Sequence, residues 1–76
     1  MLDAQRERIL SGLLSELGPA VDACTPDTLV QARAVRLYWQ ARALSVKAVT
    51  FQSDPLGPLL QLEALSAARC AAEVLL

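Results

Sequence analysis

Residues 30–51 read VQARAVRLYWQARALSVKAVTF, and this segment carries the strongest structural signal in the chain. Apolar residues recur in it with alternating steps of four and three residues, the heptad pattern of a helix that packs on another helix along one stripe. Large residues alternate with alanine along this stripe, which we call the alanine seam: Val30, Ala34, Leu37, Ala41, Leu44, Ala48 and Phe51. Because the alanine side chain is short, a second helix is expected to come closest at Ala34, Ala41 and Ala48.

The same helix has a second apolar face, formed by Val35, Trp39, Val46 and Val49 with Tyr38 at its edge. A helix that is apolar on two sides must be covered on two sides. Other helices of the chain can supply both covers, or one cover can be another molecule, and the sequence leaves both alternatives open. Tyr38 and Trp39 are candidate interface residues, because aromatic side chains with a polar atom are frequent in binding hot spots. The alternative for both is an ordinary position in the core.

Prolines divide the 76-residue chain into three helical segments, which are expected to form a single α-helical domain over residues 1–76. The first helix is expected over about residues 2–17. A kink at Gly18-Pro19 and a continuation to about residue 23 should follow, because proline lacks the backbone donor of a regular helix. A clean end at Gly18 is the alternative.

The second helix is expected over about residues 26–52, with Thr25 as its N-cap and Pro26 in its first turn. The third is expected over about residues 56–76, after the break at Ser53-Asp54-Pro55. Short connections make neighbouring helices antiparallel. The expected fold is therefore all-α: an antiparallel helical hairpin with a third helix, similar to a three-helix bundle with a long central helix.

The third helix is apolar along a stripe with the same spacing of four and three residues: Leu60, Ala64, Ala67, Ala71 and Val74. We expect this helix either to dock against the hairpin or to insert into a groove of a partner, as amphipathic helices do.

The composition favours a partner. Hydrophobic residues make up 54% of the chain, although it contains only one Phe, one Trp and one Tyr. Domains of this size bury only about 60% of the surface of the unfolded chain. The surplus of leucine and valine over what a small core can hide indicates that a second chain covers part of the surface, with apolar residues scattered over helix surfaces as the alternative.

The chain has few groups for covalent chemistry. It contains no histidine, the commonest general base and metal ligand. Cys24 and Cys70 form no CxxC pair, so we expect two reduced thiols rather than a zinc site, with a disulfide as the alternative. No glycine-rich phosphate-binding loop is present. We therefore predict no catalytic residue, no cofactor and no metal, and a protein that is not an enzyme.

The N-terminal residues give no sign of export. Four of the first eight residues, MLDAQRER, are charged, and no apolar signal segment follows them. No stretch approaches the ~18 uncharged apolar residues of a membrane span. The expected location is the cytoplasm, with no membrane partner.

A narrow polar stripe lies between the two apolar faces of the second helix. A basic stripe on a helix can follow a phosphate backbone, which makes a nucleic-acid-binding regulator one hypothesis. Its candidate basic stripe consists of Arg33, Arg36, Arg42 and Lys47. The net charge of −1 provides no overall attraction for nucleic acid, so we favour a solvated face that pairs with acidic residues of neighbouring helices.

The segment from Cys24 to Leu44 resembles the small helical-hairpin co-chaperones of the type III secretion needle subunit. The likeness rests on Cys24-Thr25-Pro26-Asp27 at the start of the second helix and on Gln40-Ala41-Arg42-Ala43-Leu44 further along it. The resemblance implies a short, cytosolic, nearly all-helical protein without catalytic residues, which holds an aggregation-prone secretion subunit together with a second chaperone. It covers under a third of the chain, and the third helix departs from a two-helix hairpin.

The leading hypothesis is a small non-catalytic protein–protein interaction module, a co-chaperone, adaptor or inhibitor, that binds a partner protein by helix packing. The residues expected to contact the partner are those of the alanine seam together with Tyr38 and Trp39. The alternatives are the nucleic-acid-binding regulator and a self-associating helical bundle. The expected partner is thus another protein or a second copy of the chain.

A large side chain in place of Ala41 tests the alanine seam. Ala41→Leu is expected to destabilise the protein by about 1–3 kcal/mol, because added methylenes at a close helix contact force the helices apart. Ala43→Leu, on the polar stripe, should have a small effect. Urea unfolding of both variants measures the difference, and equal, negligible changes would contradict the seam.

Overall fold

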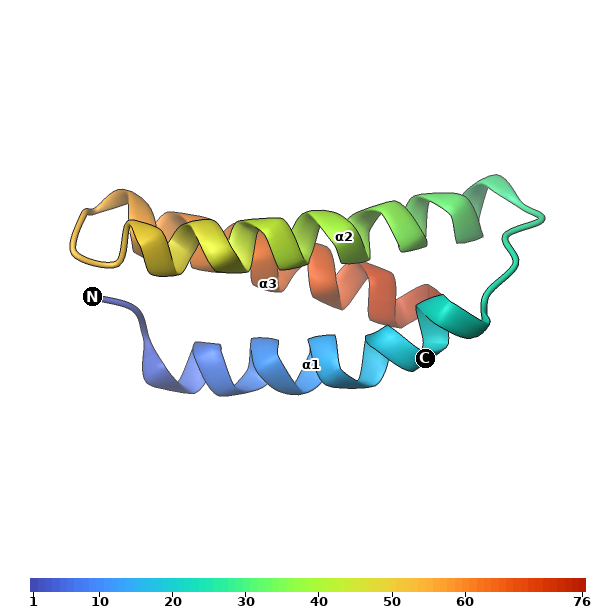
Figure 1. Ribbon diagram of the computed structural model, residues 1–76, viewed down its shortest axis with the longest axis horizontal. Helices are drawn as coiled ribbons and strands as arrows, with labels where there is room; N and C mark the ends of the chain where they lie inside the picture. The colour runs from blue at the N-terminus through green and yellow to red at the C-terminus, as the bar shows by residue number, and fades with distance from the viewer.

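The computed structural model describes all residues from Met1 to Leu76 and contains three α-helices joined by short loops. Helix α1 spans Ala4–Ala23, α2 spans Leu29–Thr50 and α3 spans Leu56–Leu75. Figure 1 shows α2 running in the opposite direction to α1 and α3, in an elongated molecule of 40 × 18 × 16 Å. The all-α fold with three bundled helices, predicted from the sequence, is confirmed.

The three helices share their contacts unequally. Helix α3 packs most extensively on α2 and less extensively on α1, whereas α1 and α2 touch each other at only a few points. In Figure 1, α3 accordingly lies behind the space between α1 and α2. Although α2 is the longest helix, α3 is the one that packs against both of the others and holds the bundle together.

Helix α1 begins at a side-chain cap and continues through a proline. The carboxylate of Asp3 accepts a hydrogen bond of 2.9 Å from the backbone N–H of Arg6, which satisfies one of the free donors of the first turn. The helix does not end at Gly18 but includes Pro19 and reaches Ala23. Its last turns bend away from the line of the first part (Figure 1), as expected where proline removes a helix hydrogen bond.

Helix α2 begins later than the sequence pattern predicted, and Thr25 is not its N-cap. Thr28 caps the helix: its hydroxyl accepts a 3.2 Å hydrogen bond from the N–H of Gln31. The side chain of Gln31 in turn accepts a 3.0 Å bond from the N–H of Asp27. This reciprocal pair resembles a capping box, which needs Gln or Glu three residues after the cap. Thr25 has Thr28 in that place, so it lacks the second half of the motif.

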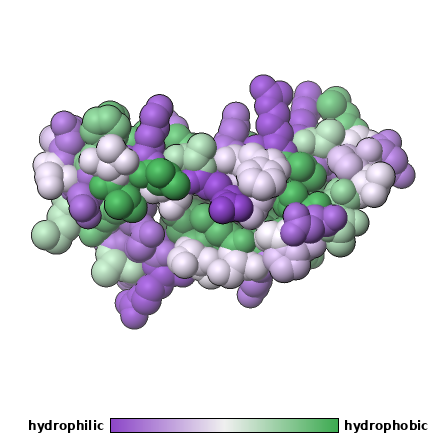
Figure 2. All heavy atoms as spheres, viewed as in Figure 1, coloured by the Kyte–Doolittle hydropathy of each residue, from purple (hydrophilic) through white to green (hydrophobic).

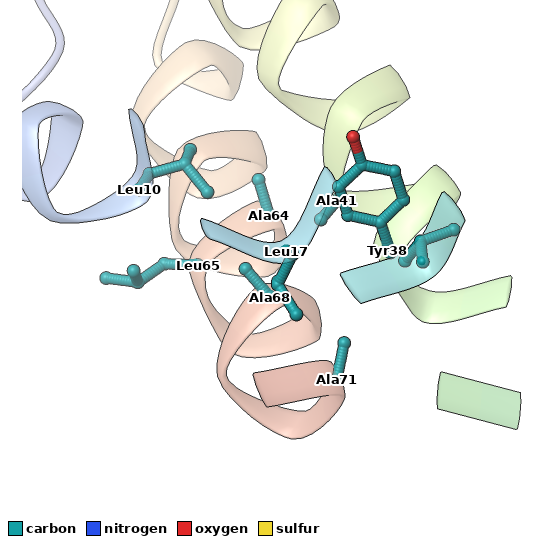
Figure 3. Packing of buried hydrophobic residues seen from close by; sticks show 9 residues of the cluster. Leu10, Leu17, Tyr38, Ala41, Ala64, Leu65, Ala68 and Ala71 are labelled. Carbon is teal, nitrogen blue, oxygen red and sulfur yellow. The ribbon is translucent and has the colours of Figure 1, made fainter. Parts of the chain in front are cut away.

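The hydrophobic core is thin, with 13 of 76 residues buried. Leucines of α1 pack in it against alanines of α2 and α3, as Figure 3 shows. One cluster contains nine of the buried residues: Leu10, Leu17, Val21, Tyr38, Ala41, Ala64, Leu65, Ala68 and Ala71. Burying one leucine side chain contributes about 1.5–3 kcal/mol, so the leucines of α1 supply much of the driving force, while the alanines allow close approach.

The alanine seam lies against the chain's own α3. Ala34, Ala41 and Ala48 are at most 1% exposed, and α3 is the helix that α2 packs on most. The larger residues Leu37 and Leu44 pack at the margin of the core and stay partly exposed. The sequence had left open which helix covers this seam, and the packing of α2 on α3 answers that question.

The buried face of α3 coincides with the predicted stripe only in part. Of that stripe only Ala64 and Ala71 are buried, while Leu60 and Ala67 are half-buried and Val74 is exposed. The buried residues of α3 are Gly57, Gln61, Ala64, Leu65, Ala68 and Ala71. Because α3 contacts two helices, its buried face is wider than one heptad stripe and extends toward α1.

Gly57 brings the start of α3 against the end of α2. A Cβ atom at this position would overlap the backbone carbonyl of Phe51 and would lie 3.0 Å from the Cα atom of Gln52. The same turn is fixed by Asp54, whose side chain accepts a 2.9 Å hydrogen bond from the N–H of Leu56. The obstacle is backbone, which cannot rotate away as a side chain can. Only glycine fits at this point.

Gly57→Ala is expected to destabilise the protein by about 1–3 kcal/mol or more, because the α2–α3 turn must move to admit the methyl group. Gly12→Ala is the matched control. Gly12 also lies in a helix, but an added methyl group there would meet no atom within 4 Å, so this change should stabilise the protein by about 0.5–1 kcal/mol. Thermal unfolding followed by circular dichroism measures both. A neutral Gly57→Ala would contradict the close approach.

Candidate interaction surface

The second apolar face of α2 remains open to solvent in the folded chain. Trp39 is 52% exposed, Val46 70% and Val49 48%, while Val35 is half-buried at the edge of the core. Figure 2 shows apolar side chains reaching the surface among polar ones on the side of the molecule it displays. No helix of the chain covers this face, so of the two alternatives that the sequence left open, the one in which the chain's own helices supply both covers is wrong.

Tyr38 and Trp39 are adjacent in sequence but lie in different environments. The Tyr38 ring is 4% exposed and belongs to the core cluster, whereas Trp39 stands at the surface. Their rings meet edge to face, with centroids 5.0 Å apart and planes at 74°. Trp39 therefore packs against a buried aromatic ring, and this contact holds its side chain in a defined orientation.

Arg42 lies over both aromatic rings. The carbon atom of its guanidinium group is 5.4 Å from the centre of the Trp39 ring and 5.8 Å from that of Tyr38. Its Nη1 donates a 3.2 Å hydrogen bond to the Tyr38 hydroxyl. Both distances to the rings lie within the range of cation–π attraction. Arg42 is exposed, yet three contacts direct its charge along this face of the helix.

This position of Arg42 corrects the candidate basic stripe. At about 100° per residue, Arg42 lies roughly 120° or more around the helix from Arg33, Arg36 and Lys47. Those three residues are exposed and lie within about 60° of one another on a different side of α2, with Arg33 directly opposite Arg42. The stripe thus has three cations rather than four, which weakens the argument for a phosphate-backbone contact.

Arg42 also completes a pattern that the apolar residues leave interrupted. With it, the exposed face follows the steps of four and three residues of a heptad seam, which we call the outer seam: Val35, Trp39, Arg42, Val46 and Val49. The sequence interpretation missed the continuity, because it assigned Arg42 to the polar side of the helix. The signal that would have found it is the spacing from Trp39 to Val46, which leaves one heptad position between them.

Several residues predicted to contact a partner are buried by contacts within the chain itself. Ala34, Ala41 and Ala48 are covered by α3, and Tyr38 is in the core, so these four are corrected from partner contacts to internal packing. Of the other predicted contacts, Val30 and Phe51 lie exposed at the two ends of the alanine seam, and Trp39 lies on the outer seam. Close packing at alanine takes place within the chain because α3 also presents alanines there.

A shallow hollow lies between α1 and α2 beside the outer seam. Its lining residues are Glu7, Ser11, Leu14 and Ser15 from α1 and Tyr38, Arg42 and Ser45 from α2. Three of them are serines, whose side chains are short, and α1 and α2 make few contacts with each other. The hollow therefore leaves space next to the guanidinium group of Arg42.

Gln61 is a structural residue that sequence analysis did not identify. It is fully buried in α3, yet both polar atoms of its side chain are bonded to the start of α1. Its Oε1 accepts from the N–H of Asp3 at 3.1 Å, and its Nε2 donates to the carbonyl of Asp3 at 2.9 Å and to Oε2 of Glu7 at 3.2 Å. A polar residue between apolar ones in α3 was the available signal, although spacing alone does not reveal its partners.

The structure shows no grouping of three or more His, Cys, Asp or Glu side chains that could hold a metal ion. Cys24 and Cys70 are both free. None of the three helices is both long and apolar enough to traverse a lipid bilayer. Comparison of the chain with protein-family models, curated proteins and solved structures gave no match.

Gln61→Leu is expected to destabilise the protein by about 1–3 kcal/mol, because the backbone N–H and carbonyl of Asp3 each lose a hydrogen bond. Hydrogen exchange at the first turn of α1 should accelerate at the same time. Gln40→Leu, at an exposed position of α2, is the control and should stay within about 0.5 kcal/mol of the wild type. Urea unfolding compares the two, and equal effects would show that the Gln61 bonds contribute nothing.

Proposed function

We propose that this chain is a small non-catalytic interaction module that binds a helix of another protein along the outer seam. The observation that carries the proposal is that Trp39, Val46 and Val49 stay exposed although all three helices are folded together. Spaced apolar residues on one helix face are the usual anchors for a partner helix. Covering them would remove apolar surface from water, which is the main driving force of association.

The composition of the outer seam supports the same function. Trp39 and Arg42 are side chains of the types most enriched among residues that dominate binding energies. Trp39 rests on the buried Tyr38 ring, so little conformational freedom is lost when a partner covers it. The seam is thus organised before binding, and a rigid anchor favours affinity.

The kind of module is also part of the proposal. A co-chaperone, an adaptor or an inhibitor would each use such a face, and the resemblance of residues 24–44 to hairpin co-chaperones of a secretion needle subunit favours the first. In that role the seam would shield an apolar helix of a client from aggregation, in the cytoplasm. A self-associating bundle is the competing function.

A photo-crosslinking experiment tests the proposal. A photoreactive amino acid placed at Val46 is expected to form a specific adduct with a protein of the source cell, while the same group at Arg33, on the opposite side of α2, forms none. Adding Trp39→Ala should abolish the adduct without unfolding the chain, since Trp39 is half-exposed.

Two results would overturn the proposal. Equal crosslinking from positions 33 and 46 would show that the outer seam is not the contact surface. An adduct of the chain with itself, together with a dimer in sedimentation equilibrium, would replace the module by a self-associating bundle.

A further inference from the structure

The outer seam has one charged position, and that position is at its centre. Arg42 has Val35 and Trp39 before it and Val46 and Val49 after it, at heptad spacing. In helix pairs, a single polar residue at a seam position sets which partner and which register are accepted, at some expense of stability. The central charge of the outer seam is therefore a determinant of partner choice.

The guanidinium group of Arg42 is held in place, but most of its N–H donors form no hydrogen bond within the chain. It donates one side-chain hydrogen bond within the chain, to the Tyr38 hydroxyl, and it stacks near two rings. A guanidinium has five N–H donors in a planar fork that matches a carboxylate. The remaining donors are available to an acceptor brought in from outside.

The one carboxylate that shares the hollow with Arg42 forms no ion pair with it. Glu7 lines the same hollow, but its Oε2 accepts a 3.2 Å hydrogen bond from Gln61 in the direction of α3. The other polar groups beside Arg42 are the short hydroxyl side chains of Ser11, Ser15 and Ser45. They leave space for an approaching helix and contribute no opposite charge.

We infer that the partner helix carries an aspartate or glutamate that pairs with Arg42, flanked at three and four residues by aliphatic side chains. The inference rests on the proposed function. A carboxylate forms two parallel hydrogen bonds with a guanidinium. Trp39, Val46 and Val49 around it exclude water, so an uncharged partner would leave the arginine buried without a counter-charge and would be rejected.

A second copy of the chain does not fit this site. A parallel, in-register pair of outer seams places the central position of one copy opposite that of the other, whereas an antiparallel pair places Arg42 opposite Trp39 or Val46 of the second copy. In the parallel pair two Arg42 side chains meet, and like charges at the centre of an interface oppose association; in the antiparallel pair Arg42 gains no counter-charge, because the outer seam carries no carboxylate. The charge at the centre selects against self-pairing and in favour of an acidic partner.

A displayed library of helical peptides tests the inference. Five positions of one helix face, at steps of four and three residues, are randomised, and the full-length chain is the sorting probe. Enriched peptides are expected to carry Asp or Glu at the central position and aliphatic residues beside it. Arg42→Gln should weaken their binding roughly 30-fold or more, because the peptide carboxylate loses its partner. Arg33→Gln, an equal loss of charge on the opposite side of α2, should leave binding unchanged.

A charge exchange makes the test reciprocal. Sorting with Arg42→Glu is expected to enrich Lys or Arg at the central peptide position. The quenching or shift of fluorescence from Trp39, the only tryptophan, then reports binding at the seam directly.

The outcomes separate the inference from the proposed function. Peptides without an acidic preference that are lost with Trp39→Ala would overturn the inference and leave the interaction module intact. Equal weakening by Arg33→Gln would also overturn it, because the attraction would then be non-specific. Absence of any enriched helix would overturn both, as would binding of duplex DNA or RNA that depends on Arg42.

Discussion

Close contact between α2 and α3 at alanine governs the arrangement of the whole molecule. Ala34, Ala41 and Ala48 are buried where α2 packs on α3, and α3 presents alanines and Gly57 in return. Small side chains on both sides bring the helix axes together and leave little volume between them. The large side chains of the core must then come from α1. Its leucines pack over the surface that α2 and α3 form together (Figure 3).

The open face of α2 follows from the same packing. With α3 on one side and α1 contacting α3 more than α2, no element of the chain is left to cover the outer seam. Its central arginine keeps this surface compatible with water while the chain is alone, because the charge is hydrated and the rings below it are partly shielded. Three of the thirteen large hydrophobic residues that stay exposed, Trp39, Val46 and Val49, lie on this seam beside the charge of Arg42. In the proposed interaction, that charge would favour a partner with a matching charge over one without.

The sequence predicted the helices and their closest contact, but not the roles of two residues, Gln61 and Gly57. The existence of three helices, their approximate limits and the close approach at alanine could be predicted, because periodicity, proline and side-chain size act over a few residues. The roles of Gln61 and Gly57 could not be predicted in this way, because both depend on contacts between distant parts of the chain. The partners of Gln61 lie 54 and 58 residues away in sequence, and Gly57 is required by a backbone contact that exists only after the turn has formed.

The amino-acid sequence alone determined that this chain is helical, that one helix has two apolar faces, and that alanine marks the point of closest packing. These are local properties, since they depend on residues within one or two turns of each other. Only the tertiary structure decided that α3 covers the alanine seam, that Tyr38 is buried while Trp39 is exposed, and that Arg42 belongs to the outer seam. Those outcomes depend on where the neighbouring helices settle, and no spacing within a single helix contains that information.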